Sequence, residues 1–438
     1  VTVNAPTTTE SPPPQTSTPS AQSEQKTGVD VLVNGKVESA GTATTSKVND
    51  QTVTTISVDQ KKLEDKLASE GERAVVTIPI NTGANVVVGE LNGQMVKNME
   101  SKQAVLELKT EQATYTLPAQ QINIDAVSDQ LGGTVALQDI KVQIEIAEPS
   151  NETVKVVENA AEAGSFTLVV PPLNFNIKGT YGDKTIEVSK FNAYVERTVA
   201  IPDGIDPSKI TTGVVVEPDG TVRHVPTKVV LIDGRYYAKI NSLTNSTYSV
   251  VWHPLEFSDV ANHWAKAAVN DMGSRMVIDG TGNGLFNPDQ SITRAEFTAI
   301  VVRGLGLRLN SEGKPFSDVQ GSDWYNSAIN AAFEYHLITG FGDGEFRPND
   351  RLTREEAVVI LARAMKLTNL ISSTSDQTPE DTLLAYTDAA DVSSWAQDSM
   401  AACVQAGIIT GKPGMKLAPT DDISRAEVAA MVQRLLQK

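Results

Sequence analysis

The tetrapeptides Thr293–Glu296 (TRAE), Thr353–Glu356 (TREE) and Ser424–Glu427 (SRAE) are three copies of one short sequence, and they decide how the C-terminal part of this chain folds. In each copy a hydroxyl residue precedes a glutamate by three positions, which is the capping box that opens an α-helix. Apolar residues follow at helical spacing, as in Phe297 and Val301, so each helix is expected to bury one face.

Each box closes a larger unit that occurs three times. A unit opens with an aromatic residue, a hydroxyl residue and an aspartate, and continues with a tryptophan, a glycine and a proline before the box arginine. The Trp-to-Arg interval is 30 residues and the Gly-to-Arg interval is 14 residues in every copy. The pattern predicts a helix, a Gly-rich loop and a capped second helix in each unit. One such pair cannot bury its apolar faces alone, so the three units are expected to pack together.

The triplet resembles the S-layer homology family. The resemblance rests on Phe257-Ser258-Asp259, Ile338-Thr339-Gly340, Phe346-Arg347-Pro348 and the TRAE boxes, and it covers about the last 180 residues. It implies non-covalent anchoring of a secreted protein to the cell wall or S-layer of a Gram-positive bacterium of Paenibacillus or Bacillus type. It further implies an all-α, three-lobed pseudo-trimer whose inter-repeat grooves bind the pyruvylated secondary cell wall polysaccharide of peptidoglycan.

The same resemblance implies that four repeated positions contact the polysaccharide: Asp259, Trp264, Gly280 and Arg294; Asp318, Trp324, Gly340 and Arg354; Asp388, Trp395, Gly411 and Arg425. Each arginine, beside free amides at a helix N-terminus, could grip a pyruvate carboxylate bidentately. The alternative is that it pairs with the neighbouring glutamate or with the opening aspartate of another repeat. Since a cation in the first helical turn opposes the helix dipole, removing it is expected to keep or raise the melting temperature.

The other positions also leave alternatives open. The tryptophans could be core residues or sugar-stacking platforms, and the glycines could permit a tight turn or a close approach of the ligand. The aspartates could cap the first helix or accept sugar hydroxyls. The third copy replaces the Gly-rich loop and the Phe-x-Pro with Lys412–Pro419. Arg425 is expected to lie beside this divergent loop and therefore to matter less for binding than Arg294 and Arg354.

The chain as a whole is predicted to be multidomain, with a β-rich N-terminal region before the helical repeats. Residues 1–27, rich in Thr, Ser and Pro, are expected to be a disordered tether. A β-rich domain with short helices follows, and the region after it resembles a β-module found before S-layer homology triplets. The expected boundaries are 28–150 and 151–255 for the β-rich parts, and 256–310, 315–368 and 385–438 for the repeats.

Local signals within the β-rich part predict individual elements. Asn34-Gly35 and Asp233-Gly234 are hairpin dipeptides, and further turns are expected at Tyr181-Gly182-Asp183 and Asp219-Gly220. Helical spacing is expected over 59–69 and 124–131. A junction of roughly four residues before Phe257 predicts that the β-rich region docks on the repeats.

Composition limits the function. A net charge of −17 argues against nucleic acid and anionic membranes as partners. The histidines are scattered, so neither a metal nor another cofactor is expected, and the Gly-Asp-Gly loop at Asp343 is expected to be a turn and not a calcium site. Cys403 is expected to be a small buried residue.

The favoured hypothesis is therefore a non-enzymatic anchor whose β-rich region acts as a spacer or assembly module, with self-assembly in a surface layer. The alternative is the anchoring part of an extracellular enzyme, for example a polysaccharide-degrading hydrolase. Its catalytic part would lie upstream or in residues 28–255.

Overall fold

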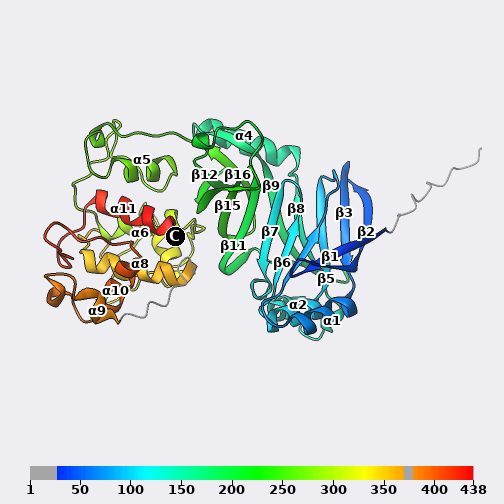
Figure 1. The fold of residues 1–438 in the computed structure, drawn as a ribbon. Helices are drawn as coiled ribbons and strands as arrows, with labels where there is room; N and C mark the ends of the chain where they lie inside the picture. The colour runs from blue at the N-terminus through cyan, green and yellow to red at the C-terminus, as the bar shows by residue number, and fades with distance from the viewer. Residues whose placement is uncertain (1–26, 369–377, 438) are drawn as a thin grey trace, which may run out of the picture.

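The computed structural model describes residues 27–368 and 378–437. Residues 27–252 form a β-rich region and residues 256–437 a helical region (Figure 1). The proposed tether and most of the Ser/Thr-rich insertion between the second and third repeats lie outside the described residues.

Sixteen strands form one sheet. The path runs β13-β12-β16-β9-β8-β5-β3-β2-β1-β4-β6-β7-β11-β15-β14, with β10 paired to β9. The β3–β5 and β4–β6 pairs are parallel and the other pairs are antiparallel. The strands are β1 (Thr27–Val33), β2 (Lys36–Val48), β3 (Gln51–Val58), β4 (Val75–Pro79), β5 (Val86–Asn92), β6 (Val105–Lys109), β7 (Ala113–Pro118), β8 (Lys141–Ala147), β9 (Thr167–Tyr181), β10 (Lys184–Glu187), β11 (Lys190–Ala200), β12 (Thr212–Val216), β13 (Val222–Val225), β14 (Thr227–Ile232), β15 (Arg235–Thr244) and β16 (Thr247–Trp252).

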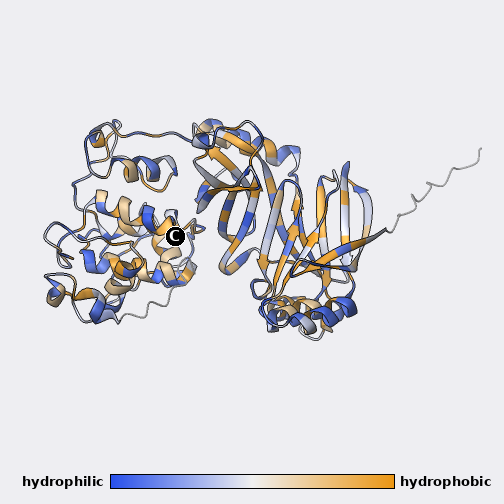
Figure 2. Ribbon diagram, in the orientation of Figure 1, coloured by the Kyte–Doolittle hydropathy of each residue, from blue (hydrophilic) through white to orange (hydrophobic). Residues whose placement is uncertain are grey.

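The sheet curls so that distant strands share one core. Hydrophobic and hydrophilic residues alternate along many strands (Figure 2), as expected when one face is buried. Tyr115 on β7 meets Phe175 on β9 edge to face, with ring centroids 5.2 Å apart. Arg197 on β11 is fully buried among aromatic rings, 4.5 Å from the ring centre of Tyr248 and 4.9 Å from that of Tyr115.

Four helices accompany this sheet: α1 (Gln60–Glu70), α2 (Gly93–Ser101), α3 (Ile124–Leu131) and α4 (Asn151–Ala163). Helices α1 and α3 and all four hairpin turns were predicted, and they are confirmed. At the Asn34-Gly35 and Asp233-Gly234 turns both residues have the positive φ of a type I′ turn. Helices α2 and α4 were missed because the apolar pattern of each is short. The proposed boundary near residue 150 falls just before α4, where β8 and β9 pair across it.

The helical region contains two helices in each repeat: α5 (Lys266–Ser274) and α6 (Arg294–Gly304), α7 (Asn326–Glu334) and α8 (Arg354–Thr368), α10 (Gln397–Gln405) and α11 (Arg425–Leu436), with α9 (Pro379–Leu383) before the third repeat. The capping boxes are confirmed, since each hydroxyl accepts from its glutamate N–H and each glutamate accepts from the backbone N–H of the hydroxyl residue. Each tryptophan lies two residues before the first helix of its repeat.

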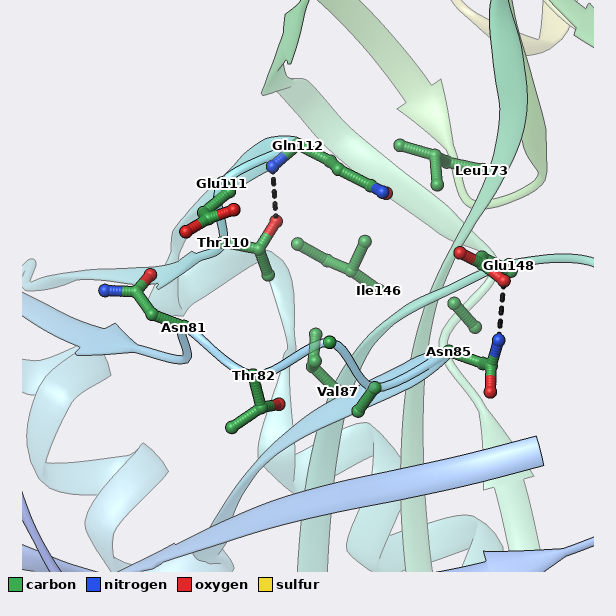
Figure 3. Close-up of a pocket in the computed structure, with 13 residues that line it drawn as sticks. Asn81, Thr82, Asn85, Val87, Thr110, Glu111, Gln112, Ile146, Glu148 and Leu173 are labelled. Carbon is green, nitrogen blue, oxygen red and sulfur yellow. Dashed lines mark hydrogen bonds between the residues drawn. The ribbon is translucent and has the colours of Figure 1, made fainter.

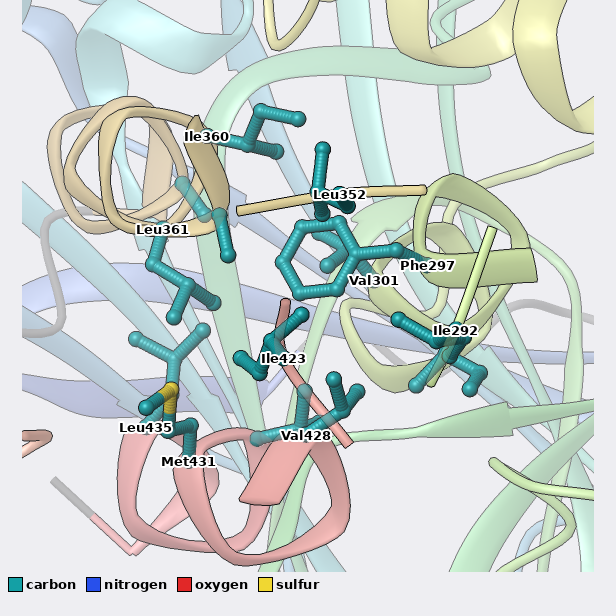
Figure 4. Packing of buried hydrophobic residues seen from close by; sticks show 14 of the residues in the cluster. Ile292, Phe297, Val301, Leu352, Ile360, Leu361, Ile423, Val428, Met431 and Leu435 are labelled. Carbon is teal, nitrogen blue, oxygen red and sulfur yellow. The ribbon is translucent and has the colours of Figure 1, made fainter. Parts of the chain in front are cut away.

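A ring of backbone hydrogen bonds joins the three repeats just before their capped helices. The N–H of Ile292 donates to Ile423 O (3.0 Å), that of Ile423 to Leu352 O (2.9 Å), and that of Leu352 to Ile292 O (3.3 Å). Their side chains are fully buried and converge with residues of α6, α8 and α11 in one core (Figure 4).

The three box arginines hold this ring together. Arg294 donates from Nε to Phe346 O (3.0 Å) and from Nη1 to Glu356 (3.2 Å), and both acceptors belong to the next repeat. Arg354 makes the same pair of bonds to Leu417 O and Glu427, and Arg425 to Phe286 O and Glu296. Burial lowers the pKa of all three guanidinium groups, which nevertheless stay charged at neutral pH.

The expected docking of the two regions is seen in specific bonds. The Tyr194 hydroxyl on β11 donates to Leu305 O (2.8 Å), and Arg223 on β13 donates to Gly306 O. Arg275, at the end of α5, donates to Thr227 O (3.2 Å). Burial raises the pKa of the Tyr194 hydroxyl above its ordinary value, so this donor keeps its proton.

We predict that Arg354→Ala lowers the melting temperature, because it leaves Glu427 and the Leu417 carbonyl without their buried partner. The expected loss of unfolding free energy is on the order of 2–4 kcal/mol. This replaces the expectation, drawn from the helix dipole alone, of an unchanged or raised melting temperature. Arg347→Ala removes ion pairs of a partly exposed side chain to Asp343 and Glu345; it is the matched control and is expected to cost about 1 kcal/mol or less. Equal thermal melts for the two variants would contradict the assignment.

We also predict that Cys403 is inert in the folded protein. Its side chain is fully buried, and burial raises the pKa of the thiol to about 12. A thiolate-seeking reagent such as iodoacetamide is expected to label it only after denaturation, because the thiolate is the nucleophile. Mass spectrometry of native and unfolded protein tests this, and rapid native labelling would count against the burial.

Candidate functional site

Two grooves lie between the repeats, and each takes its parts from all three. Groove A has a volume of about 490 Å³ and is lined by Trp264, Arg354, Thr410, Gly411, Lys412, Pro413, Glu427, Ala430, Met431 and Arg434. Groove B has a volume of about 250 Å³ and is lined by Arg294, Ile338, Thr339, Gly340, Phe341, Glu356, Val359, Ile360, Arg363 and Trp395. The structure therefore brings together predicted residues that belong to different copies of the motif.

Where the third repeat meets the first, Arg425 lies beside the loop of the first repeat. Arg425 donates from Nη2 to Asp279 O (2.8 Å), next to Gly280. The prediction that Arg425 lies beside the divergent Lys412–Pro419 loop is thus wrong, because the repeats exchange partners around the ring. That loop faces Arg354, which accordingly bonds to the carbonyl of Leu417 in place of a phenylalanine.

The tryptophans are surface residues. Trp264 and Trp324 are each 64% exposed and Trp395 is 58% exposed. The alternative that they fill the core is wrong, because each precedes its helix instead of lying on the apolar face. Trp264 and Trp395 instead form walls of grooves A and B, where an indole face can stack on a sugar ring.

The glycines are required by packing and do not have a left-handed conformation. A Cβ added at Gly280 would lie 2.7 Å from the Phe257 ring, and one added at Gly340 would lie 2.5 Å from the Phe316 ring. Gly411 is related in the same way to Tyr386, at 2.8 Å. The aromatic residue that opens each repeat therefore sits against the glycine of the same repeat, which explains why the two recur together.

The aspartates are anchors of the loop before the second helix. Asp259 accepts from the N–H groups of Phe286 and Asn287. Asp318 and Asp388 make the same pair of bonds, to residues 346–347 and 417–418. Burial raises the pKa of Asp259, but the backbone donors outweigh it and hold this pKa below its ordinary value. These carboxylates do not cap the first helix, which was one expectation. Their oxygens are already bonded within the protein.

The expectation that free amides at the helix N-terminus help to bind a carboxylate is also wrong, because these amides are already bonded. The N–H of Arg294 donates to Asp350 O and that of Ala295 to Pro348 O, and the other two capped helices repeat these bonds. With Nε and Nη1 also bonded, Arg294 and Arg354 keep Nη2 for a ligand, whereas Nη2 of Arg425 is bonded to Asp279 O. A bidentate grip would therefore compete with the bonds that hold the repeats together. Each box arginine does pair with a glutamate, but this glutamate comes from the next repeat and not from its own box.

A second set of arginines was missed. Arg303, Arg363 and Arg434 each follow the box arginine by nine residues, and this fixed offset was the available signal. Arg434 donates to Ile408 O and Thr410 Oγ1, and Arg363 donates to Leu337 O, so these bonds leave the charge uncompensated. Within the described residues neither of the two forms an ion pair, whereas Arg303 is paired with Asp279. Grooves A and B thus each expose an indole beside a net cation, a combination suited to an acidic sugar.

The β-rich region has a separate, smaller pocket of about 180 Å³ between the β4–β5 and β6–β7 loops (Figure 3). Glu111 and Glu148 line it, and Glu148 accepts from Asn85 Nδ2 at 2.7 Å. This volume lies below the usual range of about 300–1,000 Å³ for ligand sites. Within residues 27–368 and 378–437, no group of three His, Cys, Asp or Glu side chains is arranged to hold a metal ion, and no helix is long and apolar enough to cross a bilayer.

Comparison with known proteins identifies the repeats. The S-layer homology domain family matches residues 256–298, 315–358 and 385–429. Similar proteins include an amylopullulanase of Thermoanaerobacterium thermosulfurigenes, 27% identical over 88% of this chain and 19% of its own length. They also include a surface-layer 125 kDa protein of Lysinibacillus sphaericus, 32% identical over 42% of this chain and 15% of its own length.

A cellulosome-anchoring protein of Acetivibrio thermocellus is 32% identical over 37% of this chain and 35% of its own length. The chain thus spans about a third or less of each of these relatives. With the capped helices and the family match in agreement, residues 256–429 carry three consecutive S-layer homology domains, which indicate a secreted protein at the cell surface.

Proposed function

We propose that residues 256–438 form a pseudo-trimer that anchors this protein by binding the pyruvylated secondary cell wall polysaccharide in grooves A and B. The observation that carries the proposal is that an exposed tryptophan and an arginine without an ion pair in the described residues line each groove together: Trp264 with Arg434, and Trp395 with Arg363. The indole stacks on the apolar face of a sugar, and the guanidinium attracts the carboxylate of the pyruvate ketal.

The roles of the groove residues follow from this geometry. Trp264, Trp395, Arg363 and Arg434 contact the polymer. Gly340 and Gly411 let the loop backbone line the groove, and Arg294 and Arg354 hold the repeats in register while offering Nη2 to the ligand. In groove A, Lys412 adds a further cation, although it also lies near Asp421 and Glu427. No catalytic residue is assigned, and the β-rich region is a spacer or an assembly module.

A second function is favoured by specific relatives. An exoglucanase of Acetivibrio thermocellus is 34% identical over 45% of this chain, and the amylopullulanase match extends into the β-rich region. In this alternative the same grooves anchor a polysaccharide-degrading enzyme. Hydrolysis of wall or plant glycans by the 438-residue chain, abolished by a single change such as Glu111→Gln, would place the catalytic part in this region. We expect no hydrolysis.

We predict that the chain pellets with purified cell walls that carry intact secondary polymer and stays in solution with walls stripped of it. The reason is that both grooves are shaped and charged for an anionic sugar, whereas the net charge of −17 opposes nonspecific adsorption to an anionic surface. Equal pelleting with stripped walls would rule out the polymer as the ligand.

We further predict that Arg434→Ala and Arg363→Ala each weaken binding of a pyruvylated fragment by roughly 10- to 100-fold, the effect expected for losing a hydrogen bond to a charged group. Arg303→Ala is the matched control, since it occupies the same repeat position but is neutralised by Asp279. It is expected to change affinity less than about threefold, in keeping with a surface pair worth less than 1 kcal/mol.

The tryptophans provide an independent check of the same grooves. Trp264→Ala and Trp395→Ala are expected to lower affinity with unchanged melting temperature, since both indoles are exposed. Isothermal calorimetry with parallel thermal melts separates lost binding from lost folding. Loss of affinity that appears only in variants that unfold would make these positions structural.

A further inference from the structure

The two edge strands of the sheet differ in what lies against them. At one end, β13 lies against the helical region, where Arg223 donates to Gly306 O and a Cβ on Gly306 would lie 2.7 Å from His224 O. At the other end is β14 (Thr227–Ile232), which within the described part of the chain pairs with one strand, β15. The helical region reaches the first residue of β14 through the Arg275 bond to Thr227 O.

Apolar side chains are exposed along the rest of β14. Leu231 is 59% exposed, Ile232 40% and Val229 37%. Val229 lies opposite Ala238, which is fully buried in the core, and Leu231 lies opposite Tyr236, which packs against that core. Cross-strand partners share one face of a sheet. The core face of the sheet therefore continues onto β14 and remains uncovered there.

The turn fixes which backbone groups of β14 point outward. Asp233 and Gly234 form a two-residue type I′ turn, so the flanking Ile232 and Arg235 are a hydrogen-bonded pair. Alternation along the ladder then directs the N–H and C=O groups of Val229 and Leu231 away from β15. On the same pattern Tyr236 faces the other neighbour, β11, and its carbonyl indeed accepts from the N–H of Ile201.

The usual protections of an edge strand are missing from residues 229–232 of β14. It has no proline, its register with β15 is unbroken by a bulge, and residues 229–232 are Val-Val-Leu-Ile. Natural sheets normally cover, bend or charge such an edge, because it offers a template for another strand. The helical region supplies that cover at β13, and a partner strand would supply it at β14.

We propose that β14 pairs antiparallel with β14 of a second copy of this chain, about a two-fold axis at Val230. The pairing rests on the assembly role proposed for the β-rich region and identifies the surface that carries out this role. In this register the outward groups of Val229 bond to those of Leu231 of the other copy, and Val230 faces its own counterpart. The pairing is isologous, so it closes as a dimer and leaves the four grooves of the pair independent.

A second copy of the chain is the expected partner, because the strand is complementary to itself. Lys228 and Asp233 bracket the four apolar residues, so antiparallel pairing brings the cationic end of each strand to the anionic end of the other. An edge of this length buries less surface than a standard interface, so association in solution is expected to be weak. Crowding of copies on a wall would raise their effective concentration. Because each copy carries a net charge of −17, the dimer is expected to strengthen with ionic strength.

A disulfide trap tests the register directly. In the proposed pair the Cα atoms of the two Val230 residues are about 4.5 Å apart, the spacing of a non-hydrogen-bonded antiparallel pair and within disulfide reach. Full-length Val230→Cys is expected to form a covalent dimer under mild oxidation, whereas the buried Cys403 does not contribute. Val37→Cys is the matched control, because Val37 is an equally apolar, 61% exposed residue on β2, where it pairs with Leu32 of β1 and takes no part in the proposed pairing. Crosslinking of Val230→Cys no faster than that of Val37→Cys overturns the proposal.

Sedimentation of the unmodified chain over a concentration series gives the second measurement. A monomer–dimer equilibrium is expected that Leu231→Lys shifts to monomer by at least about tenfold in Kd, the effect of roughly 1.4 kcal/mol, and that Val37→Lys leaves unchanged. A wild-type chain that stays monomeric at high concentration and high salt, or a dimer that survives Leu231→Lys, overturns the proposal. All variants are expected to pellet with wall like the unmodified chain, which separates this test from that of the polysaccharide grooves.

Discussion

The helical region depends on one buried cation in each repeat that serves its neighbour. The guanidinium of each box arginine donates to a carbonyl and a glutamate of the following repeat, and the third returns to the first. A buried charge is tolerated only when its partners are in place. The fold, the loop positions and the grooves are therefore fixed together, because the carbonyl that accepts from the arginine belongs to the loop that the opening aspartate anchors.

This coupling explains what could be predicted from the sequence. The capping boxes, the hairpin dipeptides and the helices at residues 60–70 and 124–131 depend on contacts within a few residues, so their local patterns were sufficient. The exchange of partners between repeats was not predictable, since three copies with identical spacing are compatible with sites built within or between repeats. For this reason Arg425 was expected beside the loop of its own repeat, whereas it lies beside the loop of the first repeat.

Other errors have a similar physical origin. Helix-dipole reasoning considered Arg294 on an isolated helix, whereas the structure surrounds it with acceptors from residues 346 and 356. The glycines suggested backbone freedom, but the space they leave is occupied by an aromatic ring more than twenty residues away in the chain. Arg363 and Arg434 were overlooked because arginine late in a helix is favourable in any sequence. Only their position in a groove distinguishes them from an ordinary stabilising cation.

The closed ring also determines how the anchor bears mechanical load. Tension on the β-rich region reaches the first repeat through the four residues after Trp252 and through the docking bonds to residues 305 and 306. Ile292 of this repeat is bonded on one side to Ile423 and on the other to Leu352. A linear array of repeats peels from its loaded end one interface at a time, whereas a repeat clamped by both neighbours must break two interfaces at once. Pulling on such an anchor therefore loads all three repeats in parallel, and the force that detaches it is expected to rise well above that of a single helix pair.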